Sequence, residues 1–432
     1  MRLPPAIAYT TGPSEMSRNP RTHEFLCPLI VIGLLACSEA EGEGRDFGPT
    51  WGNGDSTGED EEDASLESNG DGDGDGFGDG DGDDDGDGLG NGDGDGDGFG
   101  DGDGDGDGDG DDGSEPLSGT PTEENLRVAF ISDQGHNNNT TEVLELVKAE
   151  GAAFLVIAGD FDYKDEPSAW EALTTATLGP DYPIFAVVGN HDEDEFFGSD
   201  GYQSKIILRQ QNAIDDGASC TGDPGRNNSC TYKGLFLAMS GVGVLDGKGD
   251  SADYLREQLA NNDAIWSVCV WHKNMNDMQA GGKSNATGWG VYQACQDEAG
   301  IVITGHEQSY SRTLTLTDLG NETSAHGATG QPELMVVGQG STFVSVVGLG
   351  GRAIRDYEAK KHDDDTWWAT IYTTNFYLNS WLEVEDWSPK HGALFIDFNV
   401  EGDPNKAHAY FKNTDGLIVD KYDIVRDGNS GG

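Results

Sequence analysis

Apolar runs alternate with helical patterns along the chain from Leu126 onward. Three of these runs predict buried strands: LRVAFIS (126–132), AFLVIA (153–158) and PIFAVVG (183–189). A helix is expected after the first run, because Asn139 is a capping residue with Glu142 three positions on, and another is expected around 170–176. Alternation of strands and helices in this order predicts a parallel sheet with covered faces.

The pattern continues and then changes. Further strands are expected at 234–240, 266–271 and 301–304, with helices near 252–259 and 292–298. After residue 304 the chain becomes rich in strand patterns, at 333–338, 342–348, 393–400 and 408–413. The sequence therefore predicts an α/β fold in which a second sheet packs on the first.

The charge of the chain is distributed unevenly. The 432 residues carry a formal net charge of −55, and the segment 38–120 alone holds 31 acidic residues and one basic residue, Arg45. Low hydrophobicity with high like charge prevents a segment from burying enough apolar surface to fold, so 38–124 is predicted to be a disordered linker. Its Asp-Gly repeat, 71–112, resembles the start of an EF-hand loop but lacks the closing Glu, so only weak association with Ca²⁺ is expected.

The remaining part, assigned to 125–426, has a size that suits one large domain or two small ones. It is also acidic, which argues against nucleic-acid backbone as a partner.

The N-terminal residues have the pattern of an export signal. Basic residues after Met16 precede the apolar run CPLIVIGLLA, which is too short to span a bilayer and is typical of a signal peptide. The run ends in LLAC (34–37), which resembles a bacterial lipobox, in which the cysteine is lipidated. Residues 1–37 are therefore predicted to be a signal peptide, with Met16 as an alternative start, and Cys37 to carry the anchor. An uncleaved anchor is the alternative. The expected location is the bacterial cell envelope, at the outer membrane.

Four cysteines follow Cys37, namely Cys220, Cys230, Cys269 and Cys295. An even number of cysteines in an exported protein favours disulfides, with three possible connectivities. A bridge between Cys220 and Cys230 across a turn-rich segment is expected, which leaves Cys269–Cys295.

Polar residues that bind metal ions follow five of the predicted strands, and they are Asp133, Asp160, Asn190, His272 and His306. Because the carboxyl ends of the strands in an open α/β sheet line one crevice, these side chains are expected to meet. Carboxylate, amide oxygen and imidazole together suit one or two first-row metal ions. Each motif alone is common in turns and helix caps, so the inference rests on their joint occurrence.

Taken in order, these motifs resemble those of the calcineurin-like metallophosphoesterases, and Tyr163 makes them most similar to the purple acid phosphatase branch. The motifs are Asp133-x-Gly135, Gly159-Asp160-x-x-Tyr163, Gly189-Asn190-His191-Asp192, His272 and Gly305-His306. The resemblance implies a two-sheet β-sandwich flanked by helices (α/β/β/α) and an enzyme that hydrolyses phosphate esters.

The resemblance also implies a role for each residue. Asp160 would bridge two divalent or trivalent metal ions, which would be Fe, Mn or Zn. One ion would be bound by Asp133, Tyr163 and the residue at 308, and the other by Asn190, His272 and His306. A hydroxide held by the metals would attack phosphorus. His191, oriented by Asp192, would donate a proton to the leaving-group oxygen.

Gln308 departs from this pattern, because a second imidazole is expected at its position. An amide oxygen binds late first-row metals less well than imidazole, so one of the two metals is expected to be held weakly. His136 is an alternative ligand, since the usual partner position is occupied by Gly135.

Three functions are compatible with these residues. The leading one is an exported, lipid-anchored phosphomonoesterase with a two-metal mechanism. A phosphodiesterase or nucleotide hydrolase on the same site is the second. The third is a surface lipoprotein that binds metal or phosphate with weak catalysis or none, which Gln308 favours and the His191-Asp192 pair opposes.

Overall fold

The structure is a computed structural model, and it describes residues 119–246, 248–379 and 388–428. The predicted signal peptide, the lipidation site Cys37 and nearly all of the predicted linker lie outside the described residues. Residues 119–124 were also predicted to be linker, but they are bound to the domain. The backbone N–H of Thr120 donates to Asp263 O at 2.6 Å, and the Thr120 carbonyl accepts from Ile265 N at 3.0 Å. Within the described part of the chain, no helix has the length and apolar character needed to cross a bilayer.

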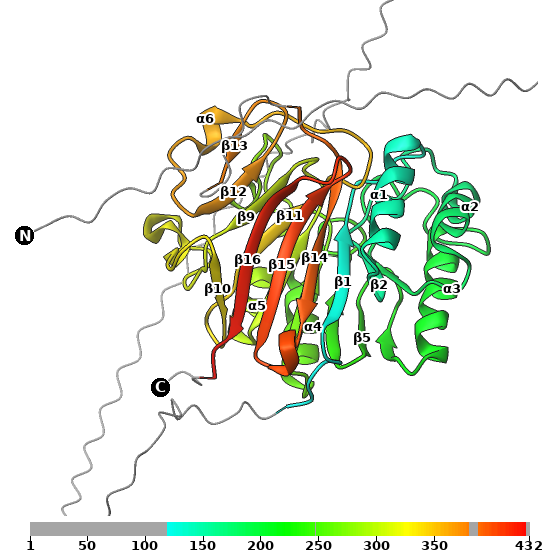
Figure 1. The fold of residues 1–432 in the computed structure, drawn as a ribbon, viewed down its shortest axis with the longest axis horizontal. Helices are drawn as coiled ribbons and strands as arrows, with labels where there is room; N and C mark the ends of the chain where they lie inside the picture. Colours follow the sequence, from blue (N-terminus) through cyan, green and yellow to red (C-terminus); the bar gives the residue numbers. More distant parts are fainter. Residues whose placement is uncertain (1–118, 247, 380–387, 429–432) are drawn as a thin grey trace, which may run out of the picture. The chain divides into compact units, whose positions relative to one another are not determined.

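One sheet joins the first three strands of the domain to its last three. Its seven strands lie in the order β10 (Leu334–Val337), β16 (Ile418–Arg426), β15 (Lys406–Asn413), β14 (Gly392–Phe398), β1 (Leu126–Ile131), β2 (Phe154–Ile157) and β3 (Ile184–Ala186). Strands β1, β2 and β3 are parallel, whereas β14 pairs antiparallel with β1. Figure 1 shows β16, β15, β14 and β1 side by side.

The second sheet is built from the middle of the chain. Its nine strands lie in the order β13 (Tyr377–Leu378), β12 (Trp368–Tyr372), β9 (Tyr310–Thr313), β11 (Val344–Val347), β8 (Gly300–Thr304), β7 (Trp266–Val270), β6 (Leu235–Met239), β5 (Asn228–Tyr232) and β4 (Ser219–Gly222). Strands β6, β7 and β8 are parallel.

Helices cover the outer face of each sheet. Against the first sheet lie α1 (Asn138–Ala149), α2 (Pro167–Leu178) and α3 (Tyr202–Asp215), and against the second lie α4 (Lys248–Ala260) and α5 (Gly290–Asp297). Alternation along β1 shows how the layers form: Val128 and Phe130 face the core between the sheets, while Ala129 and Ile131 face the helices. The described domain is therefore an α/β/β/α sandwich, as the sequence predicted.

Three sequence predictions about this fold were wrong in detail. The late strands do not form a sheet of their own: β10, β14 and β15 continue the sheet that holds β1, whereas β11 lies beside β8 in the other sheet. Helix α1 is capped by Asn137, whose side chain accepts from Thr140 N at 3.0 Å, and not by Asn139. Helix α3 and strands β4, β5, β9, β12 and β13 were not predicted at all.

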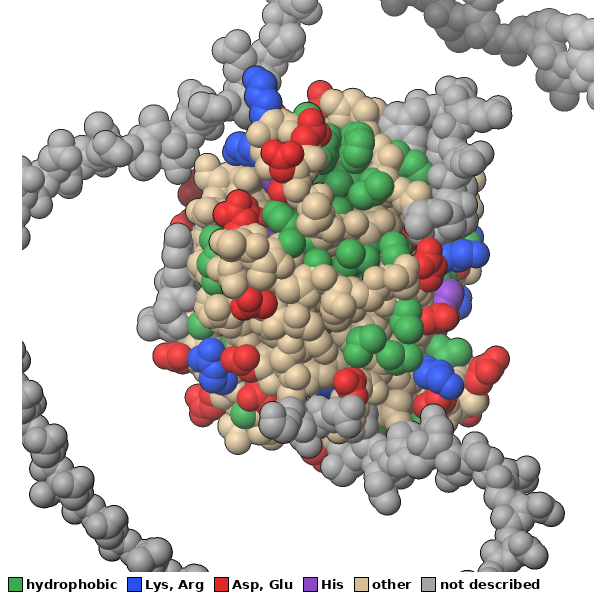
Figure 2. Space-filling model, turned by 90° about the vertical axis from the view of Figure 1, so that its left-hand side faces the viewer, with side chains coloured by type: hydrophobic (Ala, Val, Ile, Leu, Met, Phe, Trp, Pro, Cys, Tyr) green, Lys and Arg blue, Asp and Glu red, His purple; other side chains and the backbone are tan. Residues whose placement is uncertain are grey.

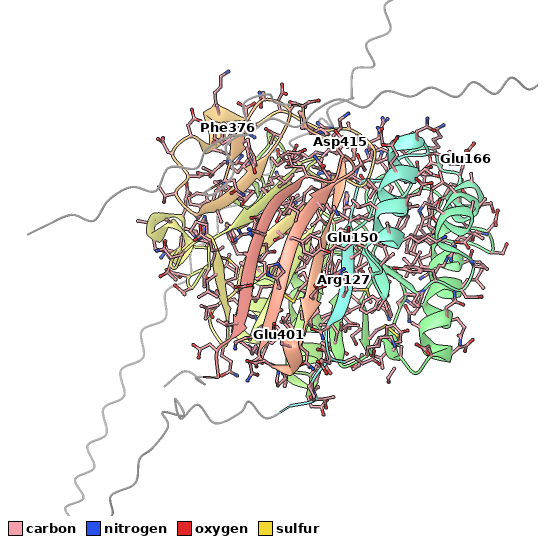
Figure 3. The ribbon with its side chains drawn as sticks, viewed as in Figure 1. Arg127, Glu150, Glu166, Phe376, Glu401 and Asp415 are labelled. Carbon is pink, nitrogen blue, oxygen red and sulfur yellow. A yellow bond between two sulfur atoms is a disulfide. The ribbon has the colours of Figure 1, made fainter. Side chains whose placement is uncertain are left out.

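Buried polar pairs and disulfides tie these layers together. Arg312 on β9 donates from Nε to Asp420 Oδ2 on β16 at 2.7 Å, and this ion pair connects the two sheets. On the outer side of β1, Arg127 pairs with Asp397 at 2.6 Å and lies beside Glu150 (Figure 3). The structure contains both expected disulfides, Cys220–Cys230 and Cys269–Cys295.

Candidate metal centre

The ends of five strands converge at one edge of the sandwich. Strands β1, β2 and β3 of the first sheet and β7 and β8 of the second end immediately before the predicted ligands. The sequence placed these strands in one open sheet, but they come from two facing sheets. Close approach of the strand ends requires glycine: a Cβ at Gly189 would lie 2.1 Å from Asp160 Oδ1, and one at Gly305 would lie 1.9 Å from Ser132 Oγ.

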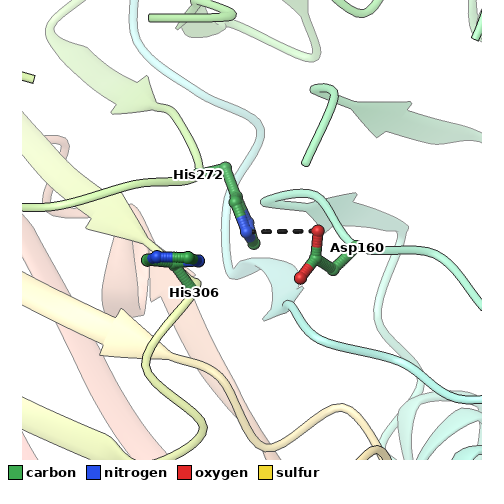
Figure 4. A group of neighbouring side chains, drawn as sticks. All are labelled: Asp160, His272 and His306. Carbon is green, nitrogen blue, oxygen red and sulfur yellow. Dashed lines mark ion pairs between the residues drawn. The ribbon is translucent and has the colours of Figure 1, made fainter. Parts of the chain in front are cut away.

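Three of the predicted ligands form a compact group, shown in Figure 4. Candidate ligand atoms of Asp160, His272 and His306 all lie within 4.8 Å of one another. His272 Nε2 is 3.2 Å from Asp160 Oδ1, and the His272 and His306 ring centroids are 5.0 Å apart. A single ion at this point would contact one carboxylate and two imidazoles.

The hydrogen bonds around His272 and Asn190 leave their ligand atoms free. His272 Nδ1 lies 2.7 Å from Ala158 O, and this bond places the hydrogen on Nδ1 and the lone pair on Nε2. His272 Nε2 and Asn190 Oδ1 are both buried and have no hydrogen-bond partner among the described residues. Buried polar atoms are rarely left unpaired, and both of these atoms have lone pairs that a cation would bind. The residues around Asp160 and His272 therefore fit a metal ion.

On the other side of Asp160, the predicted ligands bind one another. Tyr163 OH donates to Asp133 Oδ1 at 2.7 Å, and Gln308 Nε2 donates to Tyr163 OH at 3.0 Å. The second oxygen of Asp133 accepts from the backbone N–H of His306 at 2.8 Å. Gln308 thus directs its amide N–H, which cannot bind a metal, toward the other two residues. His136 is not part of the described metal-binding group.

Four site residues have a backbone conformation that non-glycine residues rarely adopt. The φ angles are 57° at Asp133, 57° at Asp160, 58° at Tyr163 and 68° at His306. Such conformations cost about 1–3 kcal/mol each and persist where the surrounding contacts enforce them. Four such conformations at one site show that its backbone is held by the surrounding contacts.

Electrostatics in this group favour a cation. Burial alone would raise the pKa of Asp160, but His272 and the backbone N–H of His191 stabilise the carboxylate and hold its pKa well below the usual range. Burial would lower the pKa of His272, but the Asp160 charge raises it overall. The pKa of His306 is well below normal because of burial and the positive charges of His272 and Lys283, so this imidazole is neutral and able to bind a metal.

Asp192 holds the backbone of the site. Its carboxylate accepts from the N–H groups of Gly189 at 2.6 Å, Asp160 at 2.9 Å and Phe161 at 2.8 Å. Within the described residues it makes no hydrogen bond to the His191 ring. The role that the structure gives Asp192 is therefore to fix the turn that carries Asp160, and not to orient His191.

His191 lies at the entrance to the site. Its side chain is exposed, and its ring packs on Tyr163 with centroids 4.3 Å apart. Both residues line a small polar depression together with Asn190, Asp165 and Asp194. The His191 imidazole thus lies beside Tyr163 and Asn190, two of the candidate metal ligands.

Two charged residues of the site were missed by the sequence analysis. Lys283 Nζ lies 3.3 Å from His306 Nδ1. Glu307 is 1% exposed, and burial raises its pKa to about 7, against the effect of Lys283 and Arg355. Glu307 was detectable because it directly follows His306, whereas Lys283 lies in a glycine-rich loop that ends no strand, and nothing in the sequence pattern marks it.

The family model of the calcineurin-like phosphoesterases matches residues 126–310. This segment of the chain is therefore similar to a calcineurin-like phosphoesterase, and it includes every candidate ligand. No curated protein matches the chain.

The solved structures to which the chain is similar share little sequence with it. A purple acid phosphatase from yellow lupin (Lupinus luteus) seeds is 16% identical, and the alignment covers 72% of this chain and 55% of that one with a TM-score of 0.47. PhoD is 10% identical over 73% of this chain and 72% of that one, with a TM-score of 0.46. A dimetal phosphatase from Danio rerio is 11% identical over 70% and 99%, with a TM-score of 0.37. The chain thus spans about half the length of the lupin protein.

Proposed function

We propose that this chain is a metal-dependent phosphoesterase. The observation that carries the proposal is that two buried ligand atoms, His272 Nε2 and Asn190 Oδ1, make no hydrogen bond within the described residues and belong to the same site as Asp160 and His306. The match of residues 126–310 to the calcineurin-like phosphoesterases supports the same activity.

Each residue has a defined part in this activity. Asp160, Asn190, His272 and His306 hold the metal ion, and their mixture of oxygen and nitrogen donors suits Fe, Mn or Zn. When bound, the ion supplies Lewis-acid polarisation of a phosphoryl oxygen. The His191 imidazole is placed at the entrance to donate a proton to the leaving-group oxygen. The two-metal mechanism predicted from the sequence requires a second ion at Asp133, Tyr163 and Gln308.

Steady-state hydrolysis of two chromogenic substrates tests this proposal. The full chain is stripped with a chelator, supplied with Mn²⁺, Fe²⁺ or Zn²⁺, and assayed with nitrophenyl phosphate and bis(nitrophenyl) phosphate. We expect turnover that requires the metal and that is abolished by His272→Ala. His408→Ala, which changes a histidine on the far strand β15, is the matched control and should keep wild-type turnover. Absence of turnover with every metal would refute the enzymatic function.

The same assay separates the competing functions. Preference for the monoester supports a phosphatase, and preference for the diester supports a phosphodiesterase. A protein that binds inorganic phosphate in calorimetry but hydrolyses neither substrate would be the binding module, which the hydrogen bond from Gln308 to Tyr163 favours.

Export and lipid anchoring remain part of the proposal. Support comes from the lipobox-like segment 34–37 and from the two disulfides, which persist in oxidising compartments. The acidic linker would then hold the catalytic domain away from the outer membrane, with weak Ca²⁺ association. Cys37→Ser should move the protein from the membrane fraction to the soluble fraction, and an unchanged distribution would contradict the anchor.

A further inference from the structure

The two halves of the candidate metal centre differ in whether their ligand atoms form hydrogen bonds. On one side, His272 Nε2 and Asn190 Oδ1 are buried and make no hydrogen bond within the described residues, and His272 Nε2 lies 3.2 Å from Asp160 Oδ1. On the other, Asp133, Tyr163 and Gln308 form a closed chain of hydrogen bonds of 2.7 Å and 3.0 Å. Among Asp133, Tyr163, Gln308, Asn190 and His272, the buried acceptor atoms without a hydrogen bond lie only in the first half.

A metal ion on the second side would have to compete with bonds that already exist. Both oxygens of Asp133 are engaged, one by Tyr163 OH and the other by the N–H of His306. The Gln308 amide would have to turn its oxygen inward and give up its bond to Tyr163. No imidazole at positions 135 or 308 offsets the loss of these bonds, because Gly135 and Gln308 occupy the two positions at which a histidine ligand was expected.

Lys283 adds a positive charge on this side. Its Nζ lies 3.3 Å from His306 Nδ1; burial lowers its pKa, while the carboxylates of Asp133, Glu307 and Asp160 act in the opposite direction and favour the charged form. A cation here partly neutralises the buried carboxylates, as a second metal ion would. It also repels any further ion that approaches Asp133.

Hydrogen bonds from side chains fix the loop that carries Lys283. The backbone carbonyl of Lys283 accepts from Asn276 Nδ2 at 2.7 Å and from Gln279 Nε2 at 2.8 Å. Two residues earlier, the carbonyl of Gly281 lies 2.9 Å from His362 Nε2, at the end of the short helix α6 (Ala359–His362). The side chains of Asn276, Gln279 and His362 therefore fix the backbone of the loop that carries Lys283.

We propose that this chain holds one metal ion, at Asp160, Asn190, His272 and His306, and that Lys283 takes the place of the second cation. Asp133, Tyr163 and Gln308 then serve as a hydrogen-bonded support for the site and not as metal ligands. The proposal rests on the proposed function in that it concerns the same site, but a metal count tests it without any turnover.

The test is the number of tightly bound metal ions in the full chain. Protein is loaded with Mn²⁺, passed over a chelating resin and analysed by elemental analysis, with His272→Ala as the reference for ions held by the acidic segment. Electron paramagnetic resonance distinguishes an isolated Mn²⁺ from an exchange-coupled pair. We expect one ion above the reference and an uncoupled spectrum. Two ions with a coupled spectrum would overturn the proposal, and this count needs no variant of the second half-site.

A pair of double variants tests the part played by Lys283. Gln308→His/Lys283→Met restores an imidazole and removes the charge, so it should gain the second ion and a coupled spectrum. Gln308→His/Lys360→Met, which removes an exposed lysine of α6, is the matched control and should still hold one ion. Equal gain in both would overturn the role of Lys283. One ion without turnover would refute the phosphoesterase alone, and two ions with turnover would refute this inference alone.

Discussion

Replacing Asp192 with asparagine removes one acceptor oxygen from a fully buried carboxylate that receives three backbone N–H groups. Two of the three bonds end on Oδ2, from Gly189 and Asp160, and one ends on Oδ1, from Phe161. The asparagine oxygen can keep the first two. Its amide nitrogen then faces the N–H of Phe161, and two donors meet with no acceptor between them.

The size of the effect follows from this arrangement. One buried N–H left unsatisfied costs about 1–3 kcal/mol. We therefore expect Asp192→Asn to lower the free energy of unfolding by about 1–3 kcal/mol. Because the turn also carries Asp160, metal affinity should fall with it.

Guanidinium unfolding followed by circular dichroism measures the stability change. Asp415→Asn, an exposed aspartate labelled in Figure 3, is the control and should change stability by less than about 0.5 kcal/mol. A double-mutant cycle with His191→Ala follows the rate of hydrolysis. If Asp192 acted only by orienting His191, Asp192→Asn would leave stability unchanged and have no effect in the His191→Ala background, and that result would refute the backbone role.

Further predictions concern the support of the site and the fold. Burial lowers the pKa of His362, but the Asp365 carboxylate raises it overall. The stabilisation from protonated His362 is therefore full below about pH 6.5 and is lost as the pH rises through the pKa of the folded state. His362→Gln should cost more unfolding free energy at about pH 5.5 than at about pH 8.5. Asp420→Asn leaves a buried arginine without its counter-charge and should cost about 3–5 kcal/mol in chemical unfolding. Removing the Cys269–Cys295 disulfide by paired serine substitution should cost about 3.5 kcal/mol, given the sequence separation of 26 residues.

The sequence predicted the elements whose hydrophobic pattern agrees with their burial. Helix α3 was not predicted because its hydrophobic pattern does not match its burial. It exposes Ile207 and Leu208, at 46% and 60%, while it buries Arg209 and Gln210, at 1% and 5%. Arg209 is satisfied by Glu171 and by backbone carbonyls of another helix end, which are contacts that no local pattern reveals. Sheet membership was equally hidden, because the pairing of β1 with β14 joins segments more than 250 residues apart.

The site could be predicted further than the fold, because its ligands follow strands directly. Asp160, His272 and His306 lie together as the order of motifs indicated. What the sequence could not give is which groups bind each other in place of a metal. The bond between Gln308 and Tyr163 and the contact between Lys283 and His306 depend on side-chain directions and on a loop fixed by distant residues.

The most direct test of the account is anomalous diffraction from crystals of the chain loaded with Mn²⁺ or Zn²⁺, measured at the absorption edge of the metal. We predict a single strong anomalous peak about 2.0–2.3 Å from His272 Nε2, Asn190 Oδ1, His306 and Asp160. A peak bound instead by Asp133 and Tyr163, or no peak at this edge of the sandwich, would contradict it.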